Sequence, residues 1–168
     1  MTKNELAFAS FFCGEGMFRI SKDIRGVGRW KPRYLTEKYK PWYRQVVRIT
    51  LRQDDEKVLD WIKANIGGHI FRRGVRSKVW NKQKGTYSWS RPVTIWQAED
   101  LETCKKVSKL VLKCPIPSKK KEEAKYLLEY IQLKKKGYRR GKKYSPKLLE
   151  KFEFYHQKLK ELKRFKEK

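Results

Sequence analysis

Long apolar runs are absent from this chain. No stretch approaches the ~20 consecutive apolar residues of a membrane-spanning helix, and no signal-peptide core occurs near the N-terminus. Cysteine and histidine are scarce, and the three cysteines, Cys13, Cys104 and Cys114, include no C-x-x-C pair. The two histidines, His69 and His156, are too few and too far apart in sequence for a zinc site. We therefore expect a soluble, intracellular protein with no membrane span and no disulfide framework.

Acidic residues are also few. The 168 residues contain 18 Asp and Glu against 44 Lys and Arg, which gives a formal net charge of +26. A large excess of positive charge opposes folding by self-repulsion, but when the protein binds phosphates it displaces their counterions, which favours binding. A membrane surface also accepts positive charge, although no apolar run accompanies it here. The composition thus favours a nucleic-acid partner, and the length suffices for one domain with a hydrophobic core.

The most informative motif is the segment 8–16, FASFFCGEG, in which apolar helical turns end in a single carboxylate, Glu15, between two glycines. Glycine on both sides lets another backbone or a phosphate approach that acid closely. An alternating strand follows at once, with basic and polar residues on one side. An acid at the junction of a helix and a basic strand is suited to hold a hydrated divalent cation against DNA. The same residues also fit an ordinary core helix that ends in a Gly-Glu-Gly turn.

Periodicity along the chain predicts a helix, two strands, a helix, two strands and then further helices. A turn-rich basic segment at 26–42 separates the first two strands, and a basic loop at 74–85 separates the next two. The expected helices and strands cover roughly 4–15, 18–25, 43–53, 54–66, 69–73, 85–97, 98–112 and a segment from 118. A basic linker at 134–143 then leads to a last helix, which Ser145 caps and Pro146 opens.

The first helix carries a stripe of small residues, Ala7, Ser10 and Gly14, opposite its phenylalanines. Such a stripe lets two helix backbones approach closely. A second copy of the chain would fit against it, and so would another helix of the same chain.

This order of elements, with the segment 8–16 in the place of the signature motif, resembles the LAGLIDADG homing endonucleases. The resemblance extends to the segments 52–59 and 119–124 and to the helix that opens at Ser145–Pro146. It implies an α+β fold of order αββαββα, with a curved antiparallel DNA-binding sheet and extra C-terminal helices. It further implies an endonuclease domain over 1–135, a basic helical extension over 136–168 packed on that domain, and, from the single motif, a homodimer. Cys13 and Ser10 depart from the family's usual acid and glycine.

The resemblance also implies site residues. Glu15 and the carbonyl of Gly14 correspond to ligands of Mg²⁺ or Mn²⁺, and Glu15, Gln53 and Lys120 correspond to catalytic positions. Gln53 also fits a helix cap. Lys119 or Lys121 also fits the role of Lys120, and the three lysines together also fit a solvated run with no role in catalysis. The expected dimer contacts are the small residues Ala7, Ser10 and Gly14.

DNA reading is expected on the sheet, because side chains two apart on a strand reach successive base edges in the major groove. Arg72 and Arg73 on the third strand are both included in the expected DNA-binding set, since periodicity does not decide which of them faces outward. Each arginine also fits a solvated rim position. The expected DNA-binding residues are Arg19, Ser21, Asp23, Arg25, Arg44, Val46, Arg48, Thr50, Arg72 and Arg73.

The sequence therefore predicts a homodimer that binds a long pseudo-palindromic DNA duplex and makes a metal-dependent double-strand break. The alternative is a non-catalytic protein of the same fold, either a maturase that binds intron RNA or a DNA-binding regulator. A basic ribosome-associated RNA binder is a third interpretation. Discrete cuts in DNA that require magnesium distinguish the first from the others.

Overall fold

The computed structural model describes residues 1–24, 41–52, 55–73, 78–81, 85–89, 92–137 and 144–163. Helices and strands alternate in the predicted order, with one additional pair of short strands. The elements are α1 (Lys3–Glu15), β1 (Gly16–Ile24), β2 (Pro41–Arg52), α2 (Glu56–Ile66), β3 (His69–Arg73), β4 (Lys78–Asn81), β5 (Thr86–Trp89), β6 (Val93–Ala98), α3 (Leu101–Lys113), α4 (Lys120–Gly137) and α5 (Pro146–Glu161).

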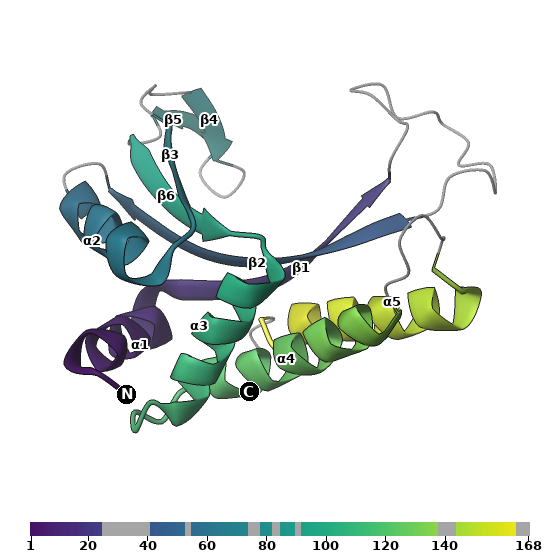
Figure 1. Cartoon of the computed structure of the whole chain (residues 1–168). Helices are drawn as coiled ribbons and strands as arrows, with labels where there is room; N and C mark the ends of the chain where they lie inside the picture. Colours follow the sequence, from purple (N-terminus) through teal and green to yellow (C-terminus); the bar gives the residue numbers. More distant parts are fainter. Residues whose placement is uncertain are drawn as a thin grey trace.

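Four strands form one antiparallel sheet in the order β1-β2-β6-β3. Figure 1 shows this sheet curving over α1, α3, α4 and α5, which lie along one face, while no helix among the described residues crosses the other face. On this four-stranded sheet, a large ligand can therefore lie on the open face without displacing a described helix. No described helix is both long and apolar enough to span a membrane.

The additional strands β4 and β5 form a separate two-stranded ribbon beyond β3 and β6 (Figure 1). The sequence predicted a loop at 74–85 and one long strand at 85–97. That prediction is wrong in detail, because the chain forms β5, then the distinct strand β6, which pairs with both β2 and β3. β6 (Val93–Ala98) is therefore shorter than the predicted strand.

Local sequence explains the helix ends. Thr2 caps α1 through a capping box with Glu5, so the helix begins at Lys3, one residue before the predicted start. Ser145 accepts a hydrogen bond from the backbone of Leu148, and Pro146 occupies the first turn of α5, as predicted.

Aromatic residues fill the core between sheet and helices. The rings of Phe12 on α1 and Phe18 on β1 lie 4.8 Å apart, and those of Tyr130 and Phe152 lie 5.0 Å apart. Phe152 belongs to α5 and is 1% exposed, so the last helix contributes to the same core as α1. The boundary expected between residues 135 and 136 falls inside α4.

The predicted basic linker does not begin at Lys134. That lysine continues the buried stripe of Leu127 and Ile131 on α4 and is 8% exposed. Its ammonium donates to the carbonyl of Tyr43 at 3.0 Å and to Oε1 of Gln45 at 2.9 Å. The pKa of Lys134 is lowered to about 8, chiefly by burial and to a smaller extent by the charge of Arg44, against the opposing effect of Cys104. Helical periodicity, rather than charge, decides where this residue lies.

Candidate nucleic-acid interface

Glu15 is the last residue of α1, and its side chain is exposed where the helix passes into β1. Gly14 is exposed as well, and a Cβ placed on it would meet nothing within 4 Å. At Gly16, by contrast, a Cβ would lie 2.4 Å from the ring of Phe12. The two glycines that flank the acid therefore serve different purposes: Gly16 admits a core ring, whereas Gly14 leaves space open beside the carboxylate.

The start of α4 docks against the end of α1. The hydroxyl of Ser118 lies 3.5 Å from the carbonyl oxygen of Cys13 and accepts a hydrogen bond from the backbone of Lys120 at 3.2 Å. Lys120 follows Ser118 by two residues, as Glu15 follows Cys13, so the structure brings the segments that carry these two predicted residues together. A hollow of about 390 Å³ lies here, lined by Cys13, Ser118, Lys119, Lys120, Glu123, Leu162 and Lys163.

The three consecutive lysines differ in their surroundings. Lys120 is partly buried and pairs with Glu123 at 3.3 Å, whereas Lys119 is exposed and Lys121 lies toward the thiols of Cys13 and Cys114. Glu123 is 3% exposed, and its second oxygen has no hydrogen-bond partner in the described part of the chain. Of the three, Lys120 is the one held by an ion pair at the hollow. Gln53 lies outside the described residues.

The donor set at this junction suits a hard cation, but the described residues of one chain do not complete it. Carboxylate and carbonyl oxygens, such as those of Glu15 and Gly14, are the ligands that Mg²⁺ and Mn²⁺ accept. Within the described residues no cluster of three or more His, Cys, Asp or Glu side chains is positioned to hold a metal.

The open sheet face carries a row of basic and polar side chains. The strand register sets Arg19 opposite Val46, Ser21 opposite Arg44 and Arg48 opposite Gln97. Arg19 and Thr50 are exposed, and the side chains of Arg44 and Asp23 are 41% and 51% exposed. These side chains lie on adjacent strands of one face.

Two members of the predicted DNA-binding set are not accessible. Ser21 is 7% exposed and Val46 is 2% exposed, which corrects the expectation that both present side chains to a ligand. Both are short, and the longer Arg19, Arg44 and Arg48 occupy the cross-strand and same-strand positions around Val46. Alternation correctly assigned their face but carried no information on neighbouring side-chain length.

Of the remaining predicted arginines, Arg72 and Arg73 are placed by strand register alone. Arg73 pairs with Val93, which in turn pairs with Arg52 of β2, whereas Arg72 pairs with Thr94. Thr94 is fully buried, so Arg72 occupies the register position of the helix-covered face and Arg73 that of the open face. Arg25 lies outside the described residues.

Sequence reasoning missed polar residues at the end of β6. Gln97 and Glu99, spaced by two, hydrogen-bond the guanidinium groups of Arg48 and Arg44, at 2.7 Å in each pair. Gln97 and Glu99 follow Ile95 by two and four residues, and this even spacing is the sequence signal that places them on the open face.

Aromatic residues on the β4–β5 ribbon were also missed. Trp80, Tyr87 and Trp89 are 50%, 65% and 61% exposed, and the rings of Trp80 and Tyr87 lie 4.9 Å apart. Tyr87 and Trp89, two residues apart, share one face of the ribbon with Trp80.

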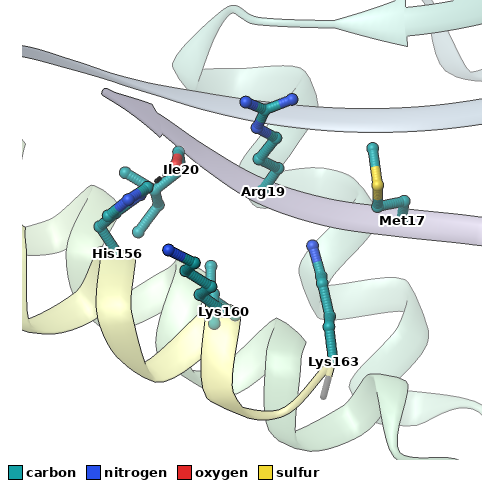
Figure 2. Close-up of a pocket in the computed structure, with 7 residues that line it drawn as sticks. Met17, Arg19, Ile20, His156, Lys160 and Lys163 are labelled. Carbon is teal, nitrogen blue, oxygen red and sulfur yellow. Dashed lines mark hydrogen bonds between the residues drawn. The ribbon is translucent and has the colours of Figure 1, made fainter. Parts of the chain in front are cut away.

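A second hollow, of about 460 Å³, adjoins β1 where α5 ends (Figure 2). Figure 2 shows Lys160 and Lys163 reaching from the end of α5 toward β1, which carries Arg19. The ring of His156 lies 2.6 Å from the carbonyl oxygen of Ile20 and ties α5 to the strand. Burial lowers the pKa of Lys163, whose ammonium donates to the carbonyl of Phe18, while the charge of Glu123 opposes that shift. This basic hollow is continuous with β1 and suits an anionic group.

The small-residue stripe of α1 is only partly free. Ala7 and Gly14 are exposed, whereas the hydroxyl of Ser10 lies 3.8 Å from Sγ of Cys114 in the same chain. The stripe therefore offers two of its three members to a partner.

Several solved structures have a fold similar to that of this chain. I-CvuI, crystallised with a DNA target and Mg, matches with a TM-score of 0.63 over 98% of this chain and 84% of its own, at 15% identity. I-TnaI matches with a TM-score of 0.59 over 96% and 97% of the two chains, at 19% identity. I-GzeII with its DNA target matches with a TM-score of 0.62 over 93% of this chain and 44% of its own, at 15% identity. All three are homing endonucleases, and the likeness confirms the predicted LAGLIDADG fold. No protein-family model and no curated protein matches the sequence.

Proposed function

We propose that this protein is a site-specific DNA endonuclease that reads a duplex with its open sheet face and hydrolyses both strands. The observation that carries the proposal is the continuity of α1 and β1. Glu15, an exposed carboxylate, directly precedes the strand that presents Arg19 to the open face. A duplex lying along that face would therefore bring phosphates to the carboxylate while its base edges meet the arginines.

We propose a homodimer because the described residues of one chain do not complete the metal site. One Glu15 per chain cannot enclose a cation. Packing α1 against α1 of a second copy, through the exposed Ala7 and Gly14, would bring two such carboxylates to one axis. A two-fold protein would then favour a pseudo-palindromic target.

Phosphodiester hydrolysis requires attack of water on phosphorus and release of the leaving oxygen. A bound Mg²⁺ or Mn²⁺, held by Glu15 and the carbonyl of Gly14, would supply an activated water and stabilise the leaving group. Lys120, oriented by its ion pair with Glu123, would stabilise the extra negative charge at the phosphate. Lys160 and Lys163 beside Arg19 would hold a neighbouring phosphate.

A single-turnover assay on a duplex selected from a random pool tests this proposal. We expect Glu15→Gln to abolish cleavage in magnesium and in manganese while specific binding by gel shift is kept, because the amide keeps the side chain's size and loses the charge that holds the cation. Glu102→Gln is the matched control, since Glu102 is exposed on α3 and pairs with Lys135. Cleavage by Glu15→Gln at the wild-type rate would remove the acid from the reaction. An unmodified protein that binds one sequence tightly and never cuts it would favour a non-catalytic nucleic-acid binder, such as a maturase acting on intron RNA.

A further inference from the structure

A chain of hydrogen bonds crosses the open sheet face from β1 to β6. Arg44 of β2 lies between two carboxylates, with Nη1 at 2.7 Å from Glu99 and Nη2 at 3.3 Å from Asp23. Arg48, four residues further along β2, donates from Nε to Oε1 of Gln97 at 2.7 Å. Gln97 in turn donates its amide hydrogen to Glu99. Two arginines of the open face are thus held by Gln97 of β6 and by Glu99, which follows the last residue of that strand.

This chain of hydrogen bonds is anchored on the helix-covered face of the sheet. The side-chain amide of Gln45 donates to the backbone carbonyl of Glu99, and its oxygen accepts from the buried ammonium of Lys134 at 2.9 Å. Gln45 and Gln97 are 4% and 8% exposed, so solvent does not compete strongly for these bonds. The anchor fixes the end of β6 relative to α4 and β2.

From this geometry we infer that Glu99 and Gln97 are positioning residues that set the base preference of Arg44 and Arg48. The inference rests on the proposed function. A mobile arginine binds any phosphate, whereas a guanidinium held in one orientation presents its fork to one base edge and loses less rotamer freedom on binding. Among the described residues, Nη1 and Nη2 of Arg44 each contact one carboxylate, and each carries two hydrogens, which leaves donors for a guanine edge.

The carboxylates also oppose indiscriminate binding. In a chain of charge +26, acids placed against an exposed arginine lower its attraction for phosphates in general. Removing one acid should therefore affect specificity and non-specific affinity in opposite directions. A residue that merely stabilised the fold would not produce that pattern.

The test compares base-preference profiles selected from a random duplex pool. Arg44→Ala first identifies the base positions that depend on Arg44. We expect Glu99→Gln to lose about tenfold of the discrimination at those same positions, with higher affinity for unrelated duplex. Glu102→Gln, which removes the same charge from exposed α3, should shift all sequences alike. Gln97→Leu should relax the positions that depend on Arg48 and is the second variant if Glu99→Gln fails to fold.

The outcomes are separable. If the wild-type protein enriches no sequence, the proposed function fails and the inference falls with it. If the wild-type protein enriches a sequence and folded Glu99→Gln and Gln97→Leu give the same profile, the inference alone is overturned. Nitrogen relaxation of the arginine Nε–H groups in the free protein is an independent readout, and we expect Arg48 to become more mobile in Gln97→Leu. Unchanged mobility would also overturn the inference.

Discussion

At the scale of single residues, the informative groups are charged side chains whose surroundings differ from those the sequence suggests. Lys134 belongs to a run of lysines but is buried, with carbonyl oxygens from β2 around its ammonium. Lys120 differs from its two lysine neighbours through its ion pair with Glu123. The same residue type therefore serves as a structural anchor in one place and as a candidate catalytic group in another, because burial and partners decide its role.

Lys134 makes the stability of the protein depend on pH. Its pKa is lowered from 10.5 to about 8 in the folded state, so the unfolded chain binds more protons between these values. The free energy of unfolding should consequently rise as pH increases from 8 to 10.5, by at most about 3 kcal/mol from this group. Lys134→Met should lose that rise, whereas Lys136→Met, on an exposed neighbour, should keep it. Urea denaturation at several pH values measures the difference, and parallel profiles for the wild type and Lys134→Met would contradict the assigned pKa.

At the scale of elements, the junction of α1 and β1 combines packing with function. Gly14 and Gly16 flank one acid, yet one faces open space and the other faces the ring of Phe12. β1 then continues over α5, and the end of that helix and the residues just after it supply Lys160 and Lys163 to the basic hollow. One short stretch of chain thus joins the core, the candidate cleavage site and the open face.

The two glycines should respond differently to alanine. Gly16→Ala places a Cβ 2.4 Å from a core ring and should destabilise the fold by about 1–3 kcal/mol. Gly14→Ala meets nothing in its own chain and should stabilise the helix by up to about 1 kcal/mol. Denaturation measures both effects. Gly14→Leu should in addition separate two packed α1 helices, so sedimentation should show a monomer that remains folded. A dimer as tight as that of the wild type would place the dimer contact elsewhere.

At the scale of the whole molecule, the net charge of +26 and the helix-free sheet face act together. In the proposed function, charge would provide long-range attraction to phosphates, and the shape of the sheet would decide which arginines approach base edges. The acids Asp23 and Glu99 on that face moderate the attraction locally.

Duplex affinity should therefore fall steeply with salt. We expect a loss of roughly a thousandfold or more between about 50 and 200 mM salt, because many phosphates release counterions on binding. The selected target should retain an advantage over unrelated duplex across this range. Fluorescence anisotropy with both duplexes measures the slopes, and an affinity insensitive to salt would exclude the sheet face and the basic hollow as the main contact surface.

Much of the fold was predictable because its signals are local. Alternation assigned Arg19, Arg44 and Arg48 to one face, and capping chemistry located the start of α5 at Ser145–Pro146. The apolar turns of 8–16 predicted a helix that ends at Glu15, and the helix ends there. The boundaries of the strands after α2 were less well predicted, because β6 pairs with strands distant in sequence.

The sequence by itself determined the order of the elements, the placement of Glu15 at a helix–strand junction and the excess of positive charge, since each depends on neighbours along the chain. Only the tertiary structure decided that Val46 is covered, that Lys134 is an anchor and that Glu99 and Gln97 hold the arginines. Those properties depend on side chains that arrive from β6 and α4, and neither periodicity nor composition specifies which residue will lie across a strand or beneath a sheet.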